Sequence, residues 1–129
     1  MCLLPEVTVA AAVIVVVAVF FAGMGCYALA APAALIRPFG IDVTTGTARS
    51  EVRAVYGGFG LGVTAVLLAA LWQDGPVRTG VLITVGAALA GMAGGRVIAA
   101  VLGDRTTFYP NWFYCGVEAA AAAALFAIA

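Results

Sequence analysis

The sequence predicts an all-α fold, an integral membrane four-helix bundle, from two observations. The 129-residue chain is 65% hydrophobic and 9% charged, and its mean hydropathy of +1.16 lies outside the balance of soluble domains. Its apolar residues fall into four stretches, at about 7–31, 51–72, 81–102 and 113–129. A bilayer core of roughly 30 Å takes about 20 helical residues, which three stretches satisfy comfortably and the fourth marginally. Because backbone groups in lipid must bond internally, we expect one compact domain over 1–129, multi-pass in the cell membrane.

The first stretch, 7–31, is predicted to be a membrane helix. It is too long for a signal peptide and no Lys or Arg precedes it, which also argues against a lipidated Cys26. Pro32 and Pro38 should end this helix. The connection 33–49 is rich in Gly and Thr, which predicts turns and no further span.

The second helix is predicted to begin at Ser50, acting as N-cap, with Glu51 in its first turn, where the helix dipole favours an anion. The four glycines Gly57, Gly58, Gly60 and Gly62 should let a neighbouring backbone approach closely in lipid, and Gly58 and Gly62 form a small-xxx-small pair. We therefore expect this helix to lie inside the bundle.

Segment 73–80 is predicted to be a tight polar turn. In the third helix, Ala87, Gly91 and Gly95 lie at four-residue spacing, and the same packing argument applies. The aromatic run from Phe108 to Tyr114 is typical of a membrane interface and predicts where the fourth helix enters the bilayer.

Composition excludes several classes of site. The chain has no His, and Cys2, Cys26 and Cys115 form no close pair, so we expect no metal and no cofactor. Cys26 and Cys115 could share a depth as a redox pair, although small buried packing residues are the favoured interpretation. A net charge of zero without a basic patch argues against nucleic-acid binding.

Two charged residues, Arg96 and Glu118, interrupt apolar stretches, where a charge is costly and therefore informative. Each lies about six residues, or roughly 9 Å, from the ends of the third and fourth helices that meet on one side. We therefore expect them at matching depth. Topology brings the start of the second helix and the loop before the fourth to the same leaflet, which predicts a cluster of Glu51, Arg53, Tyr56, Arg96, Asp104, Arg105, Tyr114 and Glu118.

That leaflet also holds the connection 33–49, so its arginines bear on orientation. The loops on this side contain three arginines, Arg37, Arg49 and Arg105, whereas the turn on the other side contains only Arg78. The positive-inside rule then predicts that both termini lie outside.

The cluster has two interpretations. One is structural, with Arg96 and Glu118 as a buried ion pair that fixes the register of two helices. The other is a polar-ended pocket in which arginines hold an anionic or carbonyl group and a carboxyl group transfers a proton. In that interpretation Glu118 and Glu51 are the candidate catalytic residues, and the candidate substrate-binding residues are Arg53, Tyr56, Arg96, Asp104 and Tyr114.

The segment from Ser50 to Gly58 resembles the signature of a family of small bacterial four-helix membrane proteins of unknown function. Its pattern is Asn or Ser, Glu, x, Arg, Ala, x, Tyr, Gly, Gly. Gly95-Arg96 and Glu118 are also similar to that family, which distantly resembles DoxX-like membrane proteins, some of them subunits of quinone-linked oxidoreductases. The resemblance implies the fold and the site but no reaction.

Two functions follow as hypotheses. The first is a membrane protein that binds a lipophilic small molecule, as an isomerase or cyclase of a terpenoid-like substrate with Glu118 or Glu51 as general acid. The second is a noncatalytic membrane subunit or scaffold that packs against a membrane partner or a second copy. A transporter is disfavoured, because charges gather in one leaflet and no polar path crosses the bilayer.

Overall fold

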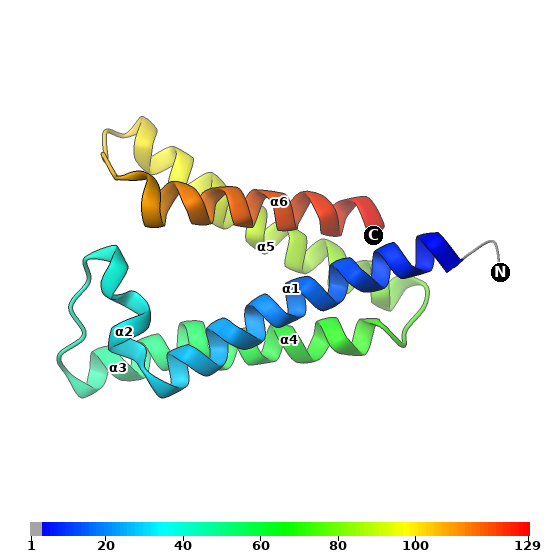
Figure 1. Ribbon diagram of the computed structural model, residues 1–129, viewed down its shortest axis with the longest axis horizontal. Helices are drawn as coiled ribbons and strands as arrows, with labels where there is room; N and C mark the ends of the chain where they lie inside the picture. The colour runs from blue at the N-terminus through cyan, green and yellow to red at the C-terminus, as the bar shows by residue number, and fades with distance from the viewer. Residues whose placement is uncertain (1–3) are drawn as a thin grey trace. The chain divides into compact units, whose positions relative to one another are not determined.

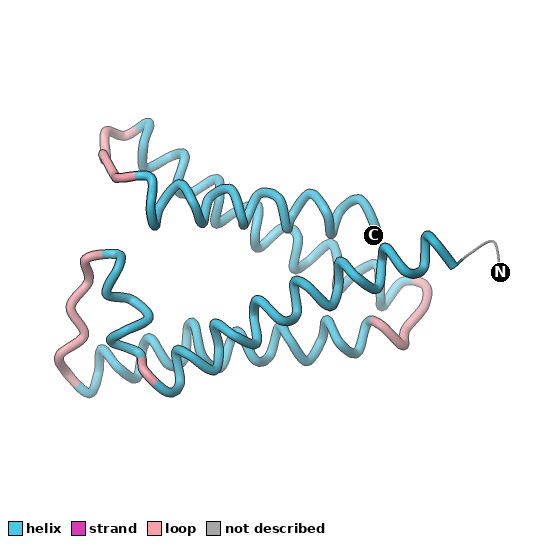
Figure 2. Tube along the Cα trace, viewed as in Figure 1, coloured by secondary structure: helices cyan, strands magenta, loops and turns pink. Residues whose placement is uncertain are grey.

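The computed structural model describes residues 4–129, with side chains from Thr8 onward, and over that range the chain is helical without a strand (Figure 2). The all-α prediction is therefore confirmed. The chain divides into two compact units, the first ending at Trp72 and the second running from Gln73 to Ala129. Each unit contains two long helical segments.

The first unit pairs α1 (Leu4–Ala30) with a second long helical segment (Figure 1). That segment consists of α3 (Gly46–Val52), the π-helical turn η2 (Arg53–Gly58) and α4 (Phe59–Ala70). Between them lie the short helix α2 (Pro32–Ile36) and the 3-10 turn η1 (Arg37–Phe39), which ends at Gly40 with a φ of 73°. Pro32 occupies the first turn of α2, where a missing N–H costs nothing.

The second helical segment begins earlier than predicted, and Ser50 is not its N-cap. Thr45 caps the helix instead: its side-chain oxygen accepts a 3.0 Å hydrogen bond from the backbone N–H of Ala48. Gly46 and the polar residues after it suggested a loop, but one satisfied cap is enough to start the helix there. Ser50 and Glu51 therefore lie within α3.

Glycine contacts join α1 to the second segment. A Cβ at Gly25 would lie 2.9 Å from the carbonyl oxygen of Gly57, and one at Gly60 would lie 3.0 Å from that of Phe21. The expected close approach is therefore confirmed at Gly57 and Gly60, whereas the Gly58–Gly62 pair was wrong, because a Cβ at Gly62 would meet nothing within 4 Å and one at Gly58 only its own helix. Close backbone approach therefore depends on Gly25, Gly57 and Gly60.

The second unit is a hairpin of α5 (Pro76–Val101) and α6 (Phe113–Ile128), the latter preceded by the π-helical turn η3 (Phe108–Trp112). The turn predicted at 73–80 ends at Gly75, about five residues earlier than expected. Gly75 has a φ of 71°, and Pro76 follows it in the first turn of α5, a position to which proline is well suited. The expected packing at Gly91 and Gly95 was wrong, since a Cβ at either would meet nothing within 4 Å. Gly86 is the close-packed glycine, against the ring of Phe126.

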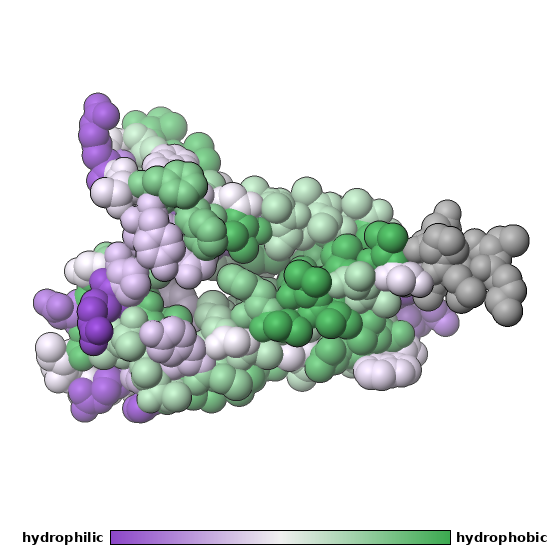
Figure 3. Space-filling view, in the orientation of Figure 1, coloured by the Kyte–Doolittle hydropathy of each residue, from purple (hydrophilic) through white to green (hydrophobic). Residues whose placement is uncertain are grey.

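Four segments are long and apolar enough to cross a membrane: Thr8–Ala30, Gly46–Ala70, Pro76–Val101 and Phe108–Ile128. Large apolar side chains are exposed along them, including Val16, Phe59, Ile98 and Val101. Much of the surface in view is accordingly hydrophobic (Figure 3). Outward-facing apolar residues of this kind suit a protein that is solvated by lipid.

Candidate functional site

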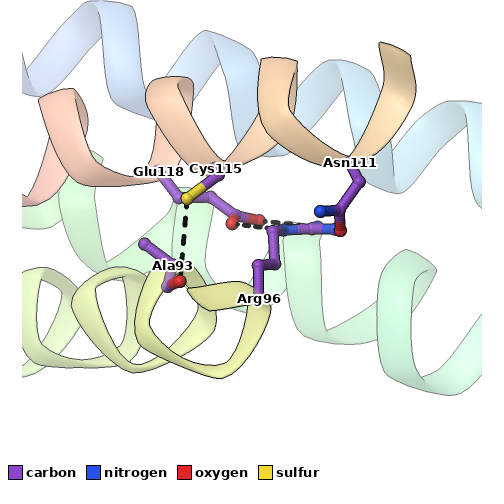
Figure 4. Close-up of polar contacts among 5 residues, drawn as sticks. All are labelled: Ala93, Arg96, Asn111, Cys115 and Glu118. Carbon is purple, nitrogen blue, oxygen red and sulfur yellow. Dashed lines mark hydrogen bonds and ion pairs between the residues drawn. The ribbon is translucent and has the colours of Figure 1, made fainter. Parts of the chain in front are cut away.

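The second unit places Arg96 of α5 against Glu118 of α6 (Figure 4). Arg96 donates from Nε to Glu118 Oε1 at 2.8 Å and from Nη2 to Oε2 at 3.0 Å, so the guanidinium meets both carboxylate oxygens in a forked pair. This geometry is specific to Arg, whose planar fork matches a carboxylate.

The pair forms because the two residues occupy matching positions in the hairpin. Arg96 lies five residues before the end of α5 at Val101, and Glu118 lies five residues after the start of α6 at Phe113. In an antiparallel hairpin, equal distances from the connection bring side chains opposite each other. The prediction that these two residues share a depth is therefore confirmed.

Asn111 completes the cluster and was not predicted. Arg96 donates from Nη1 to Asn111 Oδ1 at 3.2 Å (Figure 4). Asn111, Cys115 and Glu118 follow at i, i+4 and i+7, the spacing of one helix face, and the Cys115 thiol donates a weak 3.7 Å hydrogen bond to the Ala93 carbonyl. That spacing was readable in the sequence, but Asn111 sits in an aromatic run that suggested only an interface.

Burial differs between the partners of the pair. The Glu118 side chain is 4% exposed, whereas that of Arg96 is 21% exposed. Over the described residues, no buried side-chain nitrogen or oxygen lacks a hydrogen-bond partner. The cluster thus holds its two charges in mutual contact, which is the condition under which charges are retained at membrane depth.

Tyr114 and Asp104 are the other predicted binding residues of this unit. Tyr114 is half-buried and belongs to an aromatic group, with its ring centroid 5.2 Å from that of Phe113 and 6.1 Å from that of Tyr109. Asp104 is exposed in the loop after α5, where its backbone N–H donates to the Ala99 carbonyl.

The predicted site residues of the first unit occupy one end of the second helical segment. Arg53 donates from Nε to the backbone carbonyl of Leu29 at 3.0 Å, so it caps the last turn of α1. Glu51 is exposed and Tyr56 half-buried. The grouping of these three residues with Arg96 stays a prediction.

Within the described residues, the cysteines and acidic residues offer no assembled metal site. No group of three His, Cys, Asp or Glu side chains with metal-binding geometry occurs in the part of the chain that the structure describes. Cys26 and Cys115 are free thiols. Cys26 is exposed, so the expectation of a buried packing residue was wrong for it, because the neighbouring Gly25 is the residue that meets the Gly57 carbonyl. Cys2 lies outside the described residues.

Comparison with known families identifies a family for this chain. Residues 9–129 match the sequence model of a family described as "Domain of unknown function (DUF4345)". Since the match spans nearly the whole sequence, the chain belongs to this family. No curated protein and no solved structure shows significant similarity to it.

Proposed function

We propose that this family member is a small membrane protein that binds a lipophilic small molecule by a polar end group. Arg96 would be the recognition residue, with Glu118 and Asn111 as the residues that position it. The observation that supports this assignment is the unequal burial of the ion pair. Glu118 is almost fully enclosed, while a fifth of the Arg96 side chain remains exposed.

A guanidinium held in this way is suited to recognition. Two hydrogen bonds to Glu118 and one to Asn111 restrict its orientation. A pre-oriented Arg loses less conformational freedom when it binds a carbonyl, carboxylate or phosphate oxygen than a mobile one does. In an apolar surrounding such a contact is also stronger than it is in water.

Binding has more support than catalysis as an isomerase or cyclase. Both oxygens of Glu118 accept hydrogen bonds from Arg96, so Glu118 would have to leave that pair before donating a proton to an alkene or epoxide. Glu51, the other candidate acid, is exposed at the start of its span. We therefore assign Glu118 a positioning role within the proposed site.

A second candidate is a noncatalytic membrane subunit or scaffold. It is favoured by the hydrogen bonding of the buried polar side chains among the described residues, because a satisfied Arg96–Glu118 pair needs no ligand to account for it. The distant resemblance to DoxX-like proteins, some of them oxidoreductase subunits, agrees with this candidate. In that case the charges would serve only to join α5 and α6.

The test compares lipophilic molecules that copurify with the wild type and with the double variant Arg96→Met, Glu118→Met. Replacing both partners by apolar residues of similar length removes the charges without leaving one unpaired, so the variant is expected to fold. Arg78→Met is the matched control, because Arg78 is a half-buried arginine on the same helix, about 27 Å away along its axis.

Mass spectrometry of organic extracts should find a defined molecule with a polar end group in the wild type and the control, and at least tenfold less in the double variant. Equal amounts in all three proteins, or no defined molecule in the wild type, would contradict the binding proposal. If the protein is instead a scaffold, the wild type should be recovered from native membranes in a stable complex with a partner or a second copy. The double variant should then be recovered in the same complex.

A further inference from the structure

A hollow of about 300 Å³ lies beside the loop that joins α5 to η3. It is lined by Ala100, Gly103, Asp104, Arg105, Thr106 and Trp112. Neither Arg96 nor Glu118 is among these residues, so the hollow is separate from the ion-paired cluster. Strongly hydrophilic residues gather at the end of the second unit where this loop lies (Figure 3).

The hollow presents two opposite charges that do not neutralise each other. Asp104 and Arg105 are both exposed, and neither side chain forms an ion pair or a hydrogen bond with another side chain or backbone group of residues 8–129, the range whose side chains the structure describes. Thr106 adds a hydroxyl group that can donate or accept. A ligand with one negative and one positive group would therefore complement this surface better than an anion or a cation alone.

The location of the loop indicates where such a ligand would come from. Residues 102–107 lie between the two apolar segments that end at Val101 and begin at Phe108. If these segments cross the bilayer as proposed, the loop lies at the membrane–water boundary, among the lipid headgroups. The half-buried Trp112, which forms part of the hollow, is a residue type enriched at that boundary.

We propose that this hollow binds the headgroup of a zwitterionic phospholipid with a primary amine, phosphatidylethanolamine. Arg105 contacts the phosphate and Asp104 accepts hydrogen bonds from the ammonium group. A choline headgroup has no N–H to donate to Asp104, and a headgroup without a cation leaves Asp104 next to a phosphate. The charge pair thus favours ethanolamine over both choline and glycerol headgroups.

The experiment measures by native mass spectrometry which lipids stay bound to the protein. The protein is released from bilayer discs that contain equal amounts of phosphatidylethanolamine, phosphatidylcholine and phosphatidylglycerol with the same acyl chains. The wild type should retain ethanolamine lipid roughly two- to fivefold above the other two, the range expected for exposed charge pairs. Asp104→Asn should abolish that preference, and Arg105→Gln should reduce retention of all three lipids.

Matched controls are Asp42→Asn and Arg37→Gln, which remove an exposed acid and an exposed base from the other unit. Both should keep the wild-type preference. Equal retention of the three lipids by the wild type, or an unchanged preference in Asp104→Asn, would overturn the proposal. Binding of soluble phosphoethanolamine by a protein that shows no lipid preference would assign the hollow to a free molecule and overturn the lipid assignment.

Two measurements separate this proposal from the proposed function. Carbonate extraction of membranes tests whether the chain is inserted at all, which is the premise that both share. The Arg96→Met, Glu118→Met protein should lose its copurifying molecule while keeping the ethanolamine preference, because the hollow does not include either residue. Loss of the preference in that variant would contradict a separate headgroup site.

Discussion

The two units join their long helices by different means. In the first, α1 meets η2 and α4 through glycines, with a Cβ at Gly25 only 2.9 Å from the backbone oxygen of Gly57. In the second, α5 and α6 are joined by the charged pair of Arg96 and Glu118. Lipid tails are as apolar as leucine, so helices within a membrane need either close backbone packing or polar contacts. The close backbone approach lies in the first unit and the ion pair in the second, while Thr64 adds a polar contact to α1 in the first unit and Gly86 packs against the Phe126 ring in the second.

The difference has consequences for how each unit should fail. A glycine contact is intolerant of added volume, whereas an ion pair is intolerant of losing one partner. The following four substitutions test that distinction. In each, the free energy of unfolding is measured by reversible SDS titration from mixed micelles.

Glu118→Ala should have the largest effect, a loss of about 3–5 kcal/mol, because it leaves Arg96 between two apolar helices without its carboxylate partner. The double variant Arg96→Met, Glu118→Met should lie close to the wild type. A loss below about 1 kcal/mol in the single variant would show that the pair does not join α5 and α6 energetically.

Gly25→Ala should cost about 1–3 kcal/mol. The added methyl group would meet the Gly57 carbonyl oxygen at 2.9 Å and the Leu61 backbone nitrogen at 3.1 Å, and neither backbone atom can turn aside. Gly23→Ala is the control on the same helix, where a Cβ meets nothing within 4 Å. The control should match the wild type or exceed it, since Ala favours helix over Gly. Equal losses in both variants would refute glycine-mediated packing.

Arg53→Gln should lower stability by about 1 kcal/mol, the scale of one exposed hydrogen bond to a helix terminus. Hydrogen exchange should also rise in the last turn of α1, whose Leu29 carbonyl loses its donor. Arg49→Gln, which removes an exposed arginine of α3, should leave exchange in that turn unchanged. An equal rise of hydrogen exchange in both variants would mean that the loss of a positive charge destabilises this turn, and that the hydrogen bond from Arg53 does not stabilise it.

Thr64→Val should have the smallest effect, about 0.6 kcal/mol, typical of a hydrogen bond between membrane helices. The Thr64 hydroxyl lies 2.8 Å from the Gly60 carbonyl oxygen and 3.3 Å from that of Ala18 on α1. The isosteric change keeps volume and removes the polar contact. Thr84→Val, at an exposed position of α5, serves as control. A loss above about 2 kcal/mol would contradict this expectation. It would mean that polar contacts contribute as much to the stability of the first unit as its glycine packing does.

The sequence predicted the class of fold and the pairing of Arg96 with Glu118, because both depend on coarse regularities. Four long apolar stretches predict four helical segments, and equal distance from a hairpin connection predicts which residues face each other. Segment starts were less predictable. The cap at Thr45 depends on a single local hydrogen bond. At the start of α5, the polar and Gly residues on both sides of Pro76 suggested a turn up to residue 80, although the helix begins at Pro76.

Contacts of individual side chains were the least predictable. The Gly58–Gly62 pair was inferred from the spacing of a regular α-helix, but η2 is π-helical from Arg53 to Gly58. A π-helical turn contains more residues than an α-turn and shifts which residues face a neighbour, so Gly57 and Gly60 make the contact instead. The acceptors of Arg53 and Arg96, the Leu29 carbonyl and Asn111, likewise depend on three-dimensional placement that no local pattern encodes.

The wide turn η2 also affects how this sequence can change in length. An α-helix that gains one residue rotates everything beyond it by about 100°, unless a π-turn absorbs the addition. Because η2 separates α3 from α4, deleting a single residue between Arg53 and Gly58 would convert this wide turn into a regular α-turn and leave α3 and α4 in their present rotation. Related sequences that are one residue shorter in this segment should therefore still keep the Arg53 cap and the contact at Gly60, with an α-turn in place of η2.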